Sequence, residues 1–292
     1  MSAAPFTAAS FAAALVQMRS GADLDRNAHE LRERVAEAAG RGATYVQTPE
    51  MTGAVARGRE LLARAQDMED DLVVRVASEA AASHGVWLHI GSTPVLSPEA
   101  GRLANRALLF APDGTLRAWY DKLHMFDVDL PDGETWRESE LYRPGERAVV
   151  ADMDGVRLGL AICYDLRFPT LFAAQARAGA NVLTAPAAFT ALTGRAHWHV
   201  LTRARAIECG AFLLAAAQGG THEDGRRTFG HSIAVSPWGE VIGEIAHDEP
   251  GIVSMTIDPR ESTEARRRIA NLQHERELAL HVVKEPLSEA AE

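Results

Sequence analysis

The sequence predicts an α/β protein built from two half-sheets of one pattern, related by a pseudo-dyad. Short apolar strands alternate with helical patterns, which is typical of parallel strands covered by helices. Residues 41–50 (RGATYVQTPE) align with residues 178–187 (AGANVLTAPA), and each segment follows a strand and a helix. No Pro- or Ser-rich linker divides the 292 residues. We therefore expect one domain over residues 11–275, a flexible tail at 1–10 and a second tail at 276–292.

The first half of the chain predicts strands at 11–18, 43–48 and 86–91. Between them, apolar residues at helical spacing predict helices over 27–39 and 60–84, the second with a break near 67–70. Asp113-Gly114 between apolar runs predicts a hairpin with arms 103–111 and 115–121. The following stretch, 126–145, contains prolines, glycines and many carboxylates. It predicts a long loop, and such loops in compact domains are usually functional.

The second half repeats the pattern, starting with a buried strand at 156–162. Pro169 suits the start of the helix 170–178, because its missing N–H has no helical partner there. The remaining pattern predicts a loop at 188–194, a helix at 198–209, a turn at 237–239 and strands at 181–186, 211–218, 229–236 and 251–257. Residues 260–292 are charged and predict a largely helical segment on the surface or across a subunit.

Charge and composition disfavour several classes of protein. With 30 Lys and Arg against 40 Asp and Glu, the formal net charge is −10, so neither nucleic acid nor membrane is an expected partner. No apolar run approaches the roughly 18 residues of a membrane span. The first 17 residues lack the basic region of a signal peptide. Two cysteines give no disulfide framework, and we expect a cytoplasmic protein.

Cys163 lies where the strand 156–162 ends and a tight polar connection leads into the next helix. Backbone N–H groups and the helix dipole at such a bend favour a thiolate and can hold an oxyanion. Position alone leaves open a structural role, because free cysteine often packs as a small hydrophobe.

Glu50 and Lys122 also follow strands, and they supply a carboxylate and an ammonium group. The carboxylate can take the proton of the Cys163 thiol and pass it to a leaving amine. The Lys122 ammonium and the N–H of Tyr164, the residue after the nucleophile, can then form an oxyanion hole. Taken singly, Glu50 and Lys122 read as surface charges, but the three residues together predict nucleophilic catalysis.

Other chemistries fit the sequence less well. His197, His199, His222 and His231 match no compact metal-ligand spacing. Cys163 and Cys209 form no Cys-x-x-Cys motif, and the chain has neither a Gly-x-Ser-x-Gly elbow nor a nucleotide-binding glycine fingerprint. We therefore expect no metal and no organic cofactor.

Seven motifs together resemble those of the nitrilase, or carbon–nitrogen hydrolase, superfamily. They are 48–51 (TPEM), 120–127 (YDKLHMFD), 137–139 (RES) ahead of 144–145 (PG), 162–169 (ICYDLRFP), 193–198 (TGRAHW), 203–208 (RARAIE) and 230–232 (GHS) through 237–240 (PWGE). The likeness spans residues 11 to about 274 and is greatest for the branch of deaminated glutathione amidase and ω-amidase.

This resemblance implies an α-β-β-α sandwich, a homodimer or higher homo-oligomer, and amide hydrolysis without a cofactor. It also implies that the catalytic residues are Glu50, Lys122, Cys163 and a second glutamate, Glu138. Glu134 and Glu140 lie in the same loop, so the choice of Glu138 stays open.

The expected substrate is a small carboxylate-bearing amide, of the deaminated glutathione or α-ketoglutaramate type, cleaved to acid and ammonia or amine through a cysteine thioester. Arg167 is a candidate for binding the substrate carboxylate, because a guanidinium pairs with it bidentately. The alternative for Arg167 is an ion pair with Asp165, and Thr193 is a second candidate for the anion pocket. Hydrolysis of N-carbamoyl amino acids is the alternative reaction, and a catalytically silent scaffold is the alternative of another class.

Overall fold

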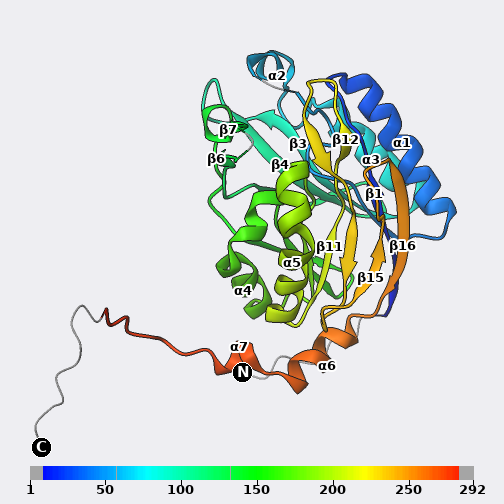
Figure 1. The fold of residues 1–292 in the computed structure, drawn as a ribbon. Coiled ribbons are helices and arrows are strands. Elements are labelled where there is room, and N and C mark those ends of the chain that lie inside the picture. Colours follow the sequence, from blue (N-terminus) through cyan, green and yellow to red (C-terminus); the bar gives the residue numbers. More distant parts are fainter. Residues whose placement is uncertain (1–8, 57, 132, 283–292) are drawn as a thin grey trace, which may run out of the picture.

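Two six-stranded sheets stack between two layers of helices in the computed structural model, which describes residues 9–56, 58–131 and 133–282 (Figure 1). Helices α1 (Leu24–Gly40) and α3 (Leu72–His84) cover one sheet, and α4 (Pro169–Arg177) and α5 (Ala191–Cys209) cover the other. This arrangement confirms the predicted α-β-β-α sandwich.

The two sheets follow the same path. The first has the order β16-β1-β2-β3-β4-β5 and the second β15-β14-β11-β10-β9-β8. In each sheet three neighbouring strands are parallel, β1-β2-β3 and β9-β10-β11, and every further strand pairs antiparallel with its neighbour. The aligned segments 41–50 and 178–187 carry the middle strands of these triplets, β2 and β10, so the predicted repeat is confirmed.

The strands of the first sheet are β1 (Phe11–Gln17), β2 (Tyr45–Gln47), β3 (Trp87–Leu96), β4 (Leu103–Phe110), β5 (Leu116–Asp121) and β16 (Gly251–Ile257). Those of the second are β8 (Val149–Met153), β9 (Val156–Leu160), β10 (Val182–Thr184), β11 (Phe212–Ala215), β14 (Ile233–Val235) and β15 (Val241–Glu244). The edge strands β8 and β15 were not predicted from the sequence.

Apolar side chains on both faces of the strands hold the layers together. Along β1, Ala13 and Leu15 face the core between the sheets, whereas Ala14 and Val16 face the core beneath α1 and α3. This alternation follows from the two-residue period of a strand. All four side chains are fully buried, which is expected for a strand covered on both faces.

The predicted loop 126–145 contains a small hairpin, β6 (Asp127–Asp129) and β7 (Thr135–Arg137), followed by the 3₁₀ helix η1 (Glu138–Glu140). Helix α5 begins within the predicted loop 188–194, because the Thr190 hydroxyl accepts the N–H of Thr193 as an N-cap. The predicted strand 229–236 is divided between β13 (Arg227–Phe229), which pairs with β12 (Gly219–Thr221), and β14. Gly230 and His231 between them have φ values of 68° and 58°.

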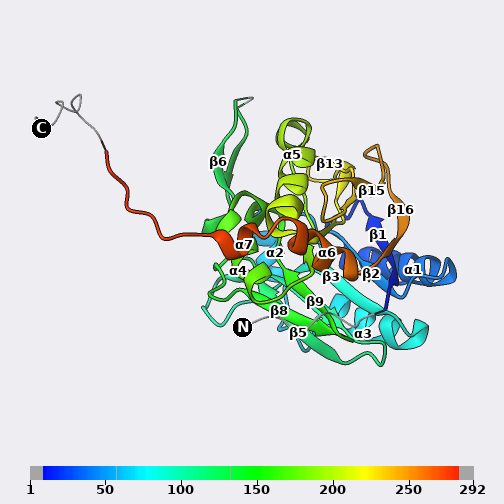
Figure 2. The same ribbon diagram turned by 90° about the horizontal axis from the view of Figure 1, so that it is seen from below.

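Shorter helices complete the chain: α2 (Arg59–Arg64), α6 (Arg260–Arg268) and α7 (Asn271–His274). Residues 275–282 form no helix and run away from the sandwich, so the helical prediction is wrong for them (Figure 2). Residues 283–292 of the predicted C-terminal segment and residues 1–8 of the predicted N-terminal tail lie outside the described residues. Within the described ranges, none of the helices has the length and apolar character to cross a bilayer.

Candidate active site

Cys163 is the first residue of η2 (Cys163–Arg167), the 3₁₀ helix that follows β9. Its φ is +49°, a left-handed conformation that is uncommon outside glycine and clusters at functional sites. The Cys163 N–H donates to the Pro186 carbonyl after β10 at 2.9 Å. Two neighbouring strand ends therefore fix the backbone that carries the thiol.

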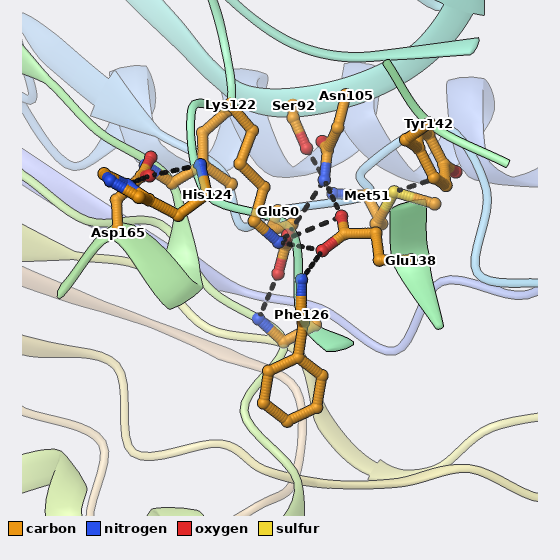
Figure 3. Close-up of polar contacts among 12 residues, drawn as sticks. Glu50, Met51, Ser92, Asn105, Lys122, His124, Phe126, Glu138, Tyr142 and Asp165 are labelled. Carbon is orange, nitrogen blue, oxygen red and sulfur yellow. Dashed lines mark hydrogen bonds and ion pairs between the residues drawn. The ribbon is translucent and has the colours of Figure 1, made fainter. Parts of the chain in front are cut away.

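Asp165 ties this turn to the end of β5. Its Oδ2 accepts the Ile162 N–H at 2.9 Å and the Tyr120 hydroxyl at 2.7 Å. Its Oδ1 accepts from His124, through the backbone N–H at 3.1 Å and with Nδ1 at 2.7 Å (Figure 3). Because the Asp165 carboxylate is fully buried and so engaged, the alternative of an Arg167–Asp165 ion pair is wrong.

Lys122 lies between two carboxylates (Figure 3). Its Nζ is 2.9 Å from Glu50 Oε1, 3.0 Å from Glu138 Oε1 and 2.8 Å from Glu138 Oε2. The Glu138 Oε2 also accepts the Phe126 N–H at 2.7 Å. Of the three glutamates in the 126–145 stretch, Glu138 is the one that the structure brings to Lys122.

Asn105 of β4 joins the same cluster and was missed in the sequence. Its Nδ2 donates to Glu50 Oε1 at 2.9 Å and to Glu138 Oε1 at 3.2 Å, while its carbonyl accepts the Lys122 N–H at 3.0 Å. A polar residue within an apolar strand was the available signal, since buried amides are hydrogen-bonded in nearly all structures.

The second half of the chain completes the surroundings of Glu50. The Ala188 N–H, just after β10, donates to Glu50 Oε2 at 2.9 Å. The Cys163 thiol lines the same cavity as Glu50, and each of the two groups shifts the pKa of the other. Glu50, Lys122 and Cys163 are thus brought together as the sequence predicted, and all three are buried.

Burial is the largest influence on each of the three groups, but it does not decide all of them. It opposes ionisation of Glu50, yet the Lys122 charge and hydrogen bonds from Cys163, Lys122 and Asn105 lower the pKa of this carboxyl below its usual value. It also opposes the charge on Lys122, but Glu138 and Glu50 raise the pKa of the ammonium well above its ordinary value.

For Cys163, burial and the adjacent Glu50 charge raise the pKa of the thiol well above its ordinary value. The expectation of a thiolate favoured at rest is therefore wrong for this site, because desolvation and the neighbouring carboxylate outweigh Lys122. The resting arrangement is a neutral thiol beside an ionised carboxylate and an ammonium. In this arrangement the Cys163 thiol can transfer its proton to the Glu50 carboxylate as the sulfur attacks.

The cluster forms the wall of a cavity of about 380 Å³. Tyr164, Arg167 and Thr193 line it as well. The Arg167 guanidinium lies 3.2 Å from His197 Nδ1 and stacks over Phe189, 5.4 Å from the ring centre. The Thr193 hydroxyl is 2.9 Å from that of Thr190. All the site residues predicted from the sequence therefore border one space.

The other three histidines considered as metal ligands also have partners in the protein. His222 bonds to the Ser20 carbonyl and the Thr228 hydroxyl, both at 2.8 Å, His231 to the Phe229 carbonyl and His199 to Glu244. Across residues 9–56, 58–131 and 133–282, no three His, Cys, Asp or Glu side chains are grouped to hold a metal ion.

Comparisons with known proteins identify relatives in sequence and in fold. The deaminated glutathione amidase of Yersinia enterocolitica is 41% identical over 265 residues, which cover 90% of this chain and 92% of that protein. Human omega-amidase NIT2 is 35% identical over 260 residues, covering 89% and 93%. The crystal structure of Saccharomyces cerevisiae Nit3, a member of the nitrilase superfamily, has a TM-score of 0.82 at 27% identity and covers 92% of this chain and 97% of that one.

The sequence model of one family also matches nearly the whole chain. It is described as Carbon-nitrogen hydrolase, and its match runs over residues 12–267. The sandwich, the extent of this match and the amidase relatives lead to one conclusion: the chain belongs to the carbon–nitrogen hydrolase family of the nitrilase superfamily and is an amidase.

Proposed function

We propose that this amidase hydrolyses a small carboxylate-bearing amide through a thioester on Cys163. The observation that carries the proposal is the buried ion pair of Glu50 with the Lys122 ammonium on the cavity wall that also holds the Cys163 thiol. A thiol, a base and a cation within hydrogen-bond reach are the groups that acyl transfer requires.

The first half of the reaction forms the thioester. The Cys163 sulfur attacks the amide carbon as its proton passes to Glu50. The oxyanion of the tetrahedral intermediate is stabilised by the Lys122 ammonium and the Tyr164 N–H, which lies in the first turn of η2. The C–N bond then breaks, and the amine leaves with the proton held by Glu50.

The second half releases the acid. Glu50 takes a proton from water, whose oxygen attacks the thioester carbon. The C–S bond then breaks, and the proton on Glu50 passes to the sulfur and regenerates the thiol. Glu138 and Asn105 touch Lys122 or Glu50 rather than the thiol. We assign them to holding the ammonium group and the base in place.

A carboxylate on the acyl part of the substrate fits the cavity. Its volume of about 380 Å³ lies at the lower end of the range of about 300–1,000 Å³ for small-molecule sites. Arg167 lines the cavity four residues after the nucleophile, and its partner is a histidine rather than a carboxylate. The names of the relatives support α-keto amides of the deaminated glutathione or α-ketoglutaramate type.

The proposal is tested by trapping the acyl enzyme. Wild type mixed with deaminated glutathione or α-ketoglutaramate, quenched in acid, should show the mass of the acyl adduct. Cys163→Ala should show neither adduct nor turnover. Cys209→Ala, which removes the other buried thiol, is the matched control and should retain both. Turnover by Cys163→Ala above a few per cent of wild type would refute the thioester mechanism.

A further inference from the structure

Among the described residues, Arg226 lines the same cavity as Arg167 and Arg137. Arg137 is paired with Asp129 and with two backbone carbonyls, which leaves Arg167 and Arg226 as the candidates for binding a substrate anion. It lies in the connection between β12 and β13, far along the chain from the catalytic strand ends. Its guanidinium carbon is 4.6 Å from the ring centre of Trp136 on β7, and its side chain is 14% exposed. A guanidinium so stacked is held in place, so it is prepared to bind a ligand.

The hydrogen-bonding capacity of Arg226 is not used up within the protein. Its Nη2 lies 3.5 Å from Asp224 Oδ2, longer than the roughly 2.7–2.9 Å of a good charge-assisted bond. Among the described residues its Nε is buried without a hydrogen-bond partner. A buried donor in this state costs free energy, and a bidentate carboxylate would satisfy it.

Arg226 lines the cavity together with Glu50, Met51 and Tyr142. The charges of Arg226, Glu138, Glu50 and Lys122 all act on the Tyr142 hydroxyl. The same hydroxyl contacts the sulfur of Met51, the residue after Glu50, at 3.7 Å. In the proposed reaction the leaving amine receives its proton from Glu50, so the leaving group must extend toward this carboxylate.

We propose that Arg226 determines specificity by binding a carboxylate on the leaving amine, while Arg167 binds the carboxylate of the acyl part. This inference rests on the proposed function. Arg167 and Arg226 come from different elements and stack on different rings, Phe189 and Trp136. The other cations of the cavity wall, Lys122 and Arg137, are held by carboxylates at 2.7–2.9 Å, so Arg167 and Arg226 are the two left to bind substrate anions.

The test compares two amides with the same α-ketoglutaryl acyl group. In one the leaving amine is glycine, and in the other it is glycinamide, which lacks the carboxylate. The readout is the ratio of kcat/KM for the first amide to that for the second. A charged hydrogen-bonded partner predicts a ratio of roughly tenfold to a hundredfold in wild type. Arg226→Met should bring this ratio close to one.

Two further variants sharpen the comparison. Arg227→Met changes the neighbouring exposed residue, which does not line the cavity, and should keep the wild-type ratio. Arg226→Lys should give an intermediate ratio, because it keeps the positive charge but loses the planar guanidinium that binds a carboxylate through two hydrogen bonds. This variant still tests the inference if Arg226→Met fails to fold.

The inference is overturned if wild type does not discriminate between the two amides, or if Arg226→Met leaves the ratio unchanged, whatever the overall loss of activity. Affinities of both amides for Cys163→Ala, measured by calorimetry, separate this inference from the proposed function. If wild type cleaves neither amide but Cys163→Ala prefers the glycine form through Arg226, the proposed function fails and the carboxylate site stands.

Discussion

Replacement of Glu138 by glutamine tests whether this residue sustains the charge on Lys122. Both Glu138 oxygens contact the Lys122 Nζ, at 3.0 and 2.8 Å, and one also accepts the Phe126 N–H. Glutamine has nearly the same shape but removes the charge and one acceptor. A hydrogen bond to a charged group contributes about 1.5–3 kcal/mol, so kcat/KM should fall roughly 10- to 150-fold if this contact stabilises the transition state.

The pH profile gives a second measure of the same contact. Burial lowers the pKa of the Lys122 ammonium, and the charge of Glu138 is the first of the influences that reverse this and hold the pKa well above its ordinary value. Without Glu138, burial has more effect and the pKa of Lys122 must fall. The alkaline limb of kcat/KM should therefore move to lower pH in Glu138→Gln. Loss of a merely structural contact would lower the rate without moving this limb.

The assay is single-turnover acylation measured by rapid acid quench from pH 6 to pH 11, with thermal unfolding to confirm that each variant is folded. Glu140→Gln is the matched control, because Glu140 lies on the same turn and also lines the cavity, whereas the described partners of the Lys122 ammonium are Glu50 and Glu138. An unmoved alkaline limb in Glu138→Gln, or equal shifts in both variants, would refute the role given to Glu138.

Two other predictions follow from the buried groups. Glu50→Gln should slow both acylation and deacylation, since one base serves both steps, and normal single-turnover acylation in this variant would refute that assignment. His89 is fully buried, and burial lowers its pKa to about 3 from an ordinary value of 6.5. Because the unfolded chain binds this proton more tightly, the free energy of unfolding should fall as the pH drops from about 6.5 toward 3, by roughly 4–5 kcal/mol from this group. In urea unfolding across this range, His89→Gln should lose that part of the slope, and a slope equal to that of wild type would contradict the reasoning.

The sequence predicts those residues of the catalytic cluster that directly follow a strand. Glu50, Lys122 and Cys163 each follow an apolar run, and α/β sheets place their sites at the carboxyl ends of their strands. The choice of Glu138 came from the family resemblance, because nothing in the spacing separates it from Glu134 and Glu140.

Features that depend on the tertiary environment were not predictable in this way. The protonation state of Cys163 was misjudged because the helix N-terminus is visible in the sequence, whereas the depth of burial and the contact with Glu50 are not. The start of α5 was missed because the N-cap, Thr190, belongs to a stretch of mixed polarity. Arg226 gave no signal, since its place in the cavity depends on a short hairpin folding over from the second half of the chain.

The site depends on both halves of the repeat. The first half supplies Glu50, Lys122 and Asn105, and the second supplies Cys163 and the Ala188 N–H that holds Glu50. Gly91 shows how closely the halves meet: a Cβ there would stand 2.3 Å from the Thr48 carbonyl and 2.4 Å from Pro186.

Side-chain amides cross the same boundary between the sheets. Gln47 of β2 accepts the Ala216 N–H after β11 at 2.8 Å, and Gln218 donates to the Glu50 carbonyl at 3.1 Å. These bonds are buried, and the net contribution of each, about 0.5–1.5 kcal/mol, is lost if the sheets separate. Neither sheet alone can hold the base against the nucleophile. Docking of the two sheets and assembly of the catalytic cluster are therefore one event, because the same contacts accomplish both.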